Sequence, residues 1–238
     1  NGELLRKTIL AFEADSAEPL WKREGIEGLM GKTNELKKYT GLYLSAGGGR
    51  LFYVDAESVV GLDLDTGEEL WRVPRPPHEE TLSDYARLYL PGLYTLVARD
   101  DLLLLGRTTA YNRIPWNEPV RAELLALRAD TGEKVWQLEC GNWGYGSPVG
   151  VFVVDDLAWV HAFGDYALLG VDLATGKVKR RFSTSDAMNG AHHHRCYRNK
   201  ATTEYVLTAR RGVEMLGLDD GANLLHHWVR GACRYGGL

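Results

Sequence analysis

The chain has 238 residues, of which 45% are hydrophobic and 25% are charged, a composition typical of globular proteins. Its 32 acidic and 28 basic residues give a net charge of −4, which excludes the strongly basic surface expected of a protein that binds nucleic acid or an anionic membrane. No apolar run approaches the roughly 18 residues of a membrane-spanning helix, so we expect no membrane span.

The first predicted element is a β-hairpin. Thr8–Phe12 and Leu20–Trp21 flank a turn that begins at Asp15, and we expect them to form the two outer strands of a blade. We therefore expect the first residues to belong to the outer half of a blade.

That turn begins the first of five related segments. Each has an apolar alternating strand, then Asp-Thr-Gly or a related turn, then a short strand that ends in most copies in an aromatic residue. Glycine supplies the positive φ that such a turn requires, so each copy predicts an antiparallel hairpin. The copies are 15–21, 65–71, 130–136, 174–180 and 219–225.

Two further strand-like runs precede most of the hairpins. Four strands per unit predict an all-β fold, a β-propeller of four-stranded antiparallel blades. We expect about four full blades and partial blades at both ends, in a single domain over residues 1–238. The chain is either self-contained, or part of a longer seven- or eight-bladed propeller, or completed by another chain. The expected runs are Gly41–Ser45, Leu51–Asp55, Tyr94–Ala98, Leu102–Leu105, Val149–Val154, Ala158–Ala162, Arg195–Arg198 and Tyr205–Ala209.

The pattern of Leu62–Trp71 and Leu127–Trp136 resembles the repeat of the pyrroloquinoline-quinone (PQQ)-like propellers. That superfamily includes quinoprotein alcohol dehydrogenases and the scaffold lipoprotein of the outer-membrane assembly machinery. The resemblance implies that each terminal Trp packs between neighbouring blades. Residues 192–215 and 226–236 also resemble a segment of long bacterial proteins of this repeat class. A bacterial, periplasmic or extracellular protein is the matching expectation, although the residues leave a cytosolic location open.

The resemblance gives no support for PQQ itself. Quinoprotein dehydrogenases carry two adjacent cysteines over the quinone, and Cys140, Cys196 and Cys233 are all separated in this sequence. We therefore do not expect this chain to bind PQQ.

Loop lengths predict a binding face. The Asp-Thr-Gly turns share one face of the propeller, and the connections within 22–40, 74–92, 107–121 and 183–194 lie on the opposite face, where binding sites form on rigid scaffolds. Alternatively, the arginines on this face pair with neighbouring carboxylates and Trp143 is a packed lid. The candidate ligand-binding residues are Arg107, Arg113, Trp116, Trp143, Tyr145, Arg195, Arg198 and Arg230.

The cysteines and a histidine triplet suggest a metal site. We expect all three cysteines at the start of inner strands, at the mouth of the central channel. Thiolate and imidazole ligands favour zinc or copper. A disulfide between Cys196 and Cys233, or unpaired buried thiols, are the alternatives. The candidate ligands are His192, His193, His194, Cys196 and Cys233.

The leading functional hypothesis is a scaffold that binds a ligand or a protein partner, or the rest of a larger propeller, through its long-loop face. The alternative is an oxidoreductase that uses a metal or quinone near the Cys/His cluster. No catalytic constellation stands out in the sequence, so whether the protein is an enzyme stays open at this point.

Overall fold

The computed structural model describes residues 6–27, 42–77, 94–109, 119–143, 148–189, 194, 198–229 and 231. Within these residues the fold is almost entirely antiparallel β-structure, and no helix is long and apolar enough to cross a membrane. The elements are β1 (Arg6–Phe12), β2 (Pro19–Glu27), β3 (Tyr43–Gly47), β4 (Arg50–Val54), β5 (Ser58–Asp63), β6 (Glu69–Pro74), β7 (Tyr94–Arg99), β8 (Leu102–Thr108), β9 (Val120–Arg128), β10 (Lys134–Asn142), β11 (Phe152–Val154), β12 (Leu157–His161), β13 (Ala167–Asp172), β14 (Val178–Ser183), α2 (Ser185–Met188), β15 (Lys200–Ala201), β16 (Tyr205–Thr208), β17 (Val213–Gly217) and β18 (Asn223–His226).

The strands pair in sequence order as four-stranded antiparallel units. One two-stranded sheet, β1–β2, precedes the units β3–β6, β7–β10, β11–β14 and β15–β18. The second and third units are joined into one eight-stranded sheet by a single pairing of β10 with β12, between Gly141 and His161. These units confirm the predicted propeller architecture, whereas the number of blades in the complete ring stays a prediction.

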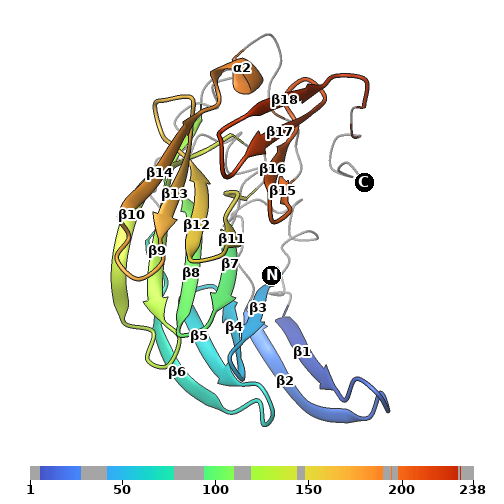
Figure 1. The fold of residues 1–238 in the computed structure, drawn as a ribbon. Helices are drawn as coiled ribbons and strands as arrows, with labels where there is room; N and C mark the ends of the chain where they lie inside the picture. The colour runs from blue at the N-terminus through green and yellow to red at the C-terminus, as the bar shows by residue number, and fades with distance from the viewer. Residues whose placement is uncertain are drawn as a thin grey trace, which may run out of the picture.

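The units follow one another along an arc from β1–β2 to β15–β18, as Figure 1 shows. The first strands of the units lie on the inner side of the arc and contact one another. Ala98 N in β7 donates to Ser45 Oγ in β3 (2.9 Å), and Thr95 Oγ1 in β7 donates to the carbonyl of Val149, just before β11 (2.6 Å). Four clusters of buried apolar side chains are found among the described residues, one at each junction between neighbouring units.

The repeated turns have the backbone geometry that the sequence predicts. The turn glycines have φ between 70° and 75°, a left-handed conformation that costs little only for residues without a Cβ. In the first copy Ala17 takes this place, with φ 57°. Asp63 fixes one turn by accepting hydrogen bonds from Thr66 N (2.8 Å) and Thr66 Oγ1 (2.9 Å). The four glycines are Gly67, Gly132, Gly176 and Gly221.

Tryptophan side chains connect neighbouring units through these turns. Each ring lies against the turn glycine of the next unit, so that a Cβ on Gly132 would come within 2.6 Å of the Trp71 ring. Each indole N–H also donates to the carbonyl three residues before that glycine. The resemblance to PQQ-like repeats correctly predicted this packing between units. The donor and acceptor pairs are Trp21 and Leu64 (2.8 Å), Trp71 and Ala129 (2.9 Å), and Trp136 and Leu173 (2.7 Å).

One predicted placement is wrong. Cys140 does not begin an inner strand: it lies in β10, the fourth strand of its unit, paired with Ala122 and fully buried. The alternating pattern after Trp136 simply continues, because β10 runs on to Asn142. The strand expected at Arg195–Arg198 lies mostly outside the described residues, and the first described strand of the last unit is β15, which pairs with β16. The expected final inner strand from Cys233 lies outside the described residues.

The glycine under each indole gives a test of the docking interaction. Gly132 and Gly164 have nearly the same φ, 75° and 73°, but only a Cβ on Gly132 would meet the Trp71 ring, since nothing lies within 4 Å of that point at Gly164. We expect Gly164→Ala to lower the free energy of unfolding by about 1 kcal/mol and Gly132→Ala by about 2–4 kcal/mol, because the second change adds steric overlap. Urea denaturation measures both, and equal losses would contradict the proposed role of the contact.

Candidate binding face

The antiparallel pairing places every long connection on one face of the fold. The turns at the opposite face are short, as between β3 and β4 or β7 and β8. We call the face with the longer segments the long-loop face; its long connections are 28–42, 75–93, 109–119, 143–151 and 184–199.

Much of the predicted site lies outside the described residues. The metal set and the disulfide therefore remain predictions, with only His194 of that set described. The residues that the structure does not describe are Arg113, Trp116, Tyr145, His192, His193, Arg195, Cys196, Arg230 and Cys233.

Arg107 lies at the end of β8 on this face and is 8% exposed. Its guanidinium forms an ion pair with Glu123 on β9 and donates to the carbonyl of Pro77 (2.5 Å). The second carboxylate oxygen of Glu123 accepts from Gln137 Nε2 (2.6 Å). Arg107 thus pairs with a carboxylate, as in the alternative weighed from the sequence, and holds the chain before β7 against the second unit.

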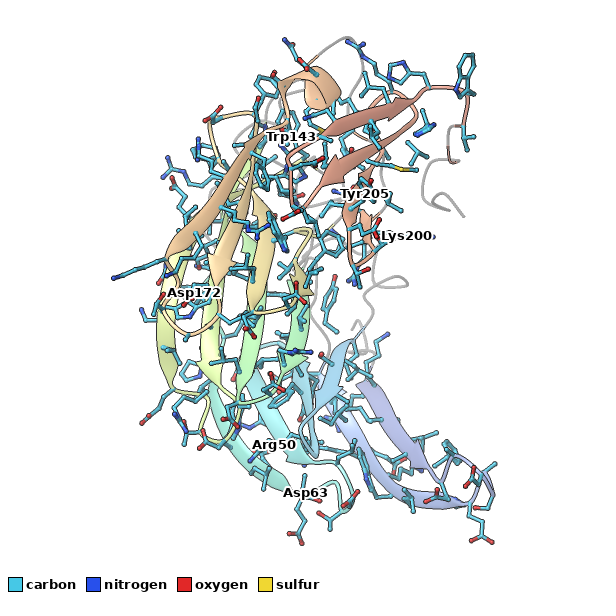
Figure 2. The ribbon with its side chains drawn as sticks, in the orientation of Figure 1. Arg50, Asp63, Trp143, Asp172, Lys200 and Tyr205 are labelled. Carbon is cyan, nitrogen blue, oxygen red and sulfur yellow. The ribbon has the colours of Figure 1, made fainter. Side chains whose placement is uncertain are left out.

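Trp143 follows β10 and is the centre of a buried cluster that joins three units. It is 6% exposed, and its ring lies 5.2 Å from that of Tyr166 and 6.5 Å, edge to face, from that of His161 on β12. The Arg210 guanidinium carbon lies 5.4 Å from the centre of the Trp143 ring, a cation–π contact. Figure 2 shows Trp143 between β14 and the β15–β18 unit. Trp143 is therefore a packed side chain.

Two buried histidines adjoin this cluster. His194 accepts a hydrogen bond at Nε2 from Ala209 N (3.3 Å), so in this arrangement Nε2 is occupied. Burial, together with the nearby His194, lowers the pKa of His161 to about 3. His161 is therefore neutral at physiological pH.

Glu214 fixes the turn that carries Arg210. The carboxylate accepts from the backbone N–H groups of Arg210 (2.7 Å), Arg211 (2.7 Å) and Gly212 (3.0 Å), and from Thr208 Oγ1 (3.2 Å). Burial alone raises the pKa of Glu214, but these hydrogen bonds to the ionised form outweigh it, and the pKa lies below the usual value. Glu214 is thus an ionised structural group whose lone pairs are already used.

Arg198, a predicted ligand-binding residue, is exposed. Burial raises the pKa of Tyr43 on β3 to about 12, and the positive charge of Arg198 partly opposes this rise, so Arg198 lies within electrostatic range of β3.

Cys140 packs among apolar side chains of the second and third units, and this burial raises the pKa of its thiol far above the usual range. The thiol stays protonated, which makes it a poor nucleophile and metal ligand.

Sequence reasoning missed several members of this face. His161, Tyr166, Arg210 and Glu214 were not singled out, although each lies at or next to a strand end on the long-loop face. Strand-end position was the available signal. It could not show that these residues meet around Trp143, because they come from different units.

Four-stranded antiparallel units joined by indole-to-turn contacts define a β-propeller of PQQ-like repeats. Residues 55–234 match the family model described as outer membrane protein assembly factor BamB. The chain belongs to this family.

Solved structures show the same fold. BamB from Moraxella catarrhalis is similar with a TM-score of 0.53 and 16% identity over 94% of this chain, which spans 59% of that protein. The dihydro-heme d1 dehydrogenase NirN in complex with DHE is similar with a TM-score of 0.55 and 16% identity. That match covers 92% of this chain and 41% of the NirN chain. Quinohemoprotein alcohol dehydrogenase from Comamonas testosteroni is similar with a TM-score of 0.51 and 11% identity. That match covers 91% of this chain and 39% of the dehydrogenase chain. A search of curated protein sequences finds no significant match.

The lowered pKa of His161 predicts how the free energy of unfolding depends on pH. Because its pKa is lower in the folded state than the 6.5 of an unfolded histidine, only the unfolded state takes up the proton between pH 6.5 and 3, and stability falls as the pH falls through this window. Between pH 7 and 4.5 His161 accounts for a loss of about 2–3 kcal/mol. We expect His161→Phe to reduce this pH dependence in urea denaturation, and the exposed control His227→Phe to leave it unchanged; an unaltered slope in His161→Phe would contradict the assignment.

Proposed function

We propose that this chain is a protein-binding scaffold that presents its long-loop face to a protein partner. The observation that carries the proposal is the one-sided distribution of connections: short turns on one face and long segments on the other, above a rigid array of sheets. A propeller with this asymmetry holds several long segments above one scaffold, which suits recognition of a large surface.

The described side chains of the long-loop face support binding over catalysis. The Glu214 carboxylate is fully hydrogen-bonded, Arg107 and Glu123 neutralise each other, and His194 Nε2 is occupied. Groups with filled hydrogen-bonding capacity stabilise a surface and are poorly placed to accept or donate protons in a reaction. These side chains thus stabilise the strand ends from which the long segments extend.

The family adds a second line of support. Its model is described as an assembly factor for outer membrane proteins, a role that requires contacts between proteins. In this proposal the chain works in a bacterial periplasm or outside the cell, alone or as part of a longer propeller. The dehydrogenases among the similar structures share the fold at 16% identity or less, and fold alone does not transfer an activity.

Site-specific photo-crosslinking in cells that naturally produce the protein tests the proposal. A photoreactive amino acid at Thr109 or Arg198, on the long-loop face, is expected to capture the same protein in both cases. The same label at Asp65 or Glu133, exposed on the turn face of the first and second units, is expected not to capture that protein. Capture from the turn face alone, or of no protein from either face, would refute the assignment of the binding face.

A matched pair of variants sharpens this test. Replacing residues 110–118 with Asn-Gly shortens the β8–β9 connection, and we expect at least a tenfold loss of the crosslinked product with an unchanged unfolding midpoint. The control replaces Asp100 and Asp101, in the short β7–β8 turn, with the same Asn-Gly, where Asp100 already has a φ of 50°. This control is expected to keep the crosslink.

A further inference from the structure

The junction between the last two units contains a pocket of about 540 Å³ on the turn face, away from the long-loop face. Its walls come from the β11–β12 turn, from β12, from Arg180 on β14, and from the β15–β16 and β17–β18 turns. In Figure 2 Tyr205 marks the β15–β18 side of this junction. The volume falls in the range of natural ligand sites, about 300–1,000 Å³.

The pocket is found where the repeat departs from its pattern. The seventh residue of the repeat is Trp at the three preceding junctions, and here it is Arg180. Arg180 Nη1 donates to the carbonyl of Leu218 (2.9 Å), equivalent to the carbonyls that accept from the tryptophans, and to Asp219 (3.0 Å). A slender guanidinium side chain thus replaces the docking hydrogen bond of the indole without filling the space of its ring.

Aromatic packing at this junction is supplied from elsewhere. Phe182 covers Gly221, the turn glycine of the last unit, and it stacks on Trp159 with ring centres 6.1 Å apart. The Trp159 ring in turn lies over Gly170, where a Cβ would be 3.0 Å from it. The junction is therefore well packed behind the pocket, and the pocket remains at its outer part.

Trp159 gives the pocket an unused hydrogen-bond donor. The side chain is 2% exposed and forms part of the pocket wall, and its Nε1 has no acceptor among the residues that the structure describes. The carbonyl that would accept from an indole at this junction, that of Leu218, is already bonded to Arg180. The indole N–H of Trp143 also lacks an acceptor among the described residues, but Trp159 lines a pocket, from which a bound molecule can supply the missing acceptor.

The pocket lining is strongly acidic. Five carboxylates face one guanidinium, a net charge of −4 that equals the net charge of the whole chain. No group of three or more His, Cys, Asp or Glu side chains in the described ranges gathers closely enough to hold a metal ion. Charges spread along a pocket suit an extended organic cation better than a metal. The carboxylates belong to Asp155, Asp156, Glu204, Asp219 and Asp220.

We propose that this pocket binds a lysine- or arginine-bearing segment of a partner protein. The basic side chain lies among the carboxylates and against Tyr205, and a backbone carbonyl of the segment accepts the hydrogen bond from Trp159 Nε1. This is a second binding surface, on the face opposite the long loops, and its test is independent of the long-loop face.

The test uses a fluorescent peptide, acetyl-Gly-Lys-Gly-Arg-Gly-amide, titrated by anisotropy at low salt. We expect saturable one-to-one binding that weakens at least tenfold in the double variant Asp155→Asn/Asp156→Asn. Both residues are exposed and Asn tolerates the φ of 52° at Asp155, so this variant keeps the fold. Asp65→Asn/Glu133→Gln removes two exposed turn-face carboxylates elsewhere, and it is expected to change the affinity less than twofold.

Two further measurements separate the pocket from general surface charge. Arg180→Trp adds a large ring to the pocket wall, and we expect it to weaken peptide binding at least tenfold, with an unchanged unfolding midpoint as the check that the junction has kept its packing. In ¹H–¹⁵N spectra the indole resonance that disappears in Trp159→Phe is expected to shift downfield on peptide binding, as an N–H does when it gains an acceptor. The proposal is overturned by equal losses in the two double variants, by an unmoved Trp159 indole signal, or by Ca²⁺ that binds the site in place of the peptide.

Discussion

The structure depends on one repeated contact, the donation of an indole N–H from one unit to a turn carbonyl of the next, above a glycine without a Cβ. A four-stranded sheet cannot cover the apolar side chains on its own faces, so each unit needs a neighbouring unit to bury them. The indole satisfies three needs at this junction: it covers apolar surface, pairs a backbone carbonyl and closes on the turn. A fold stabilised by neighbour contacts can vary its connections without losing its core.

The same contact explains why the two faces of the molecule differ. The turn face must keep its tight Asp-Thr-Gly geometry, because Trp71 and its equivalents lie on those turns. The long-loop face has no such constraint, and the chain places its longer segments there. Where the contact is altered, at Arg180, the turn face gains the acidic pocket instead. Repetition thus fixes the architecture, and departures from it mark candidate sites.

The buried ionisable groups at the junctions are either paired or kept neutral. Glu214 is ionised and accepts four hydrogen bonds, Arg107 is paired, and His161 is kept neutral by burial. Each buried charge is thus either paired or removed, as low-dielectric surroundings require. The ring and cation–π contacts around Trp143 tie the second, third and fourth units together.

The amino-acid sequence alone predicts most of the strands, the hairpins and the turn glycines, because these follow from local alternation and from the φ preference of glycine, and its resemblance to PQQ-like repeats implied the docking role of Trp71 and Trp136. It did not determine where Cys140 lies, since strand β10 extends beyond the repeat and only pairing with β9 shows that extension. Nor did it find the meeting of Trp143, His161 and Arg210, or the pocket beside Arg180. Those sites combine residues from separate units, and tertiary packing alone decides which side chains of different units come into contact.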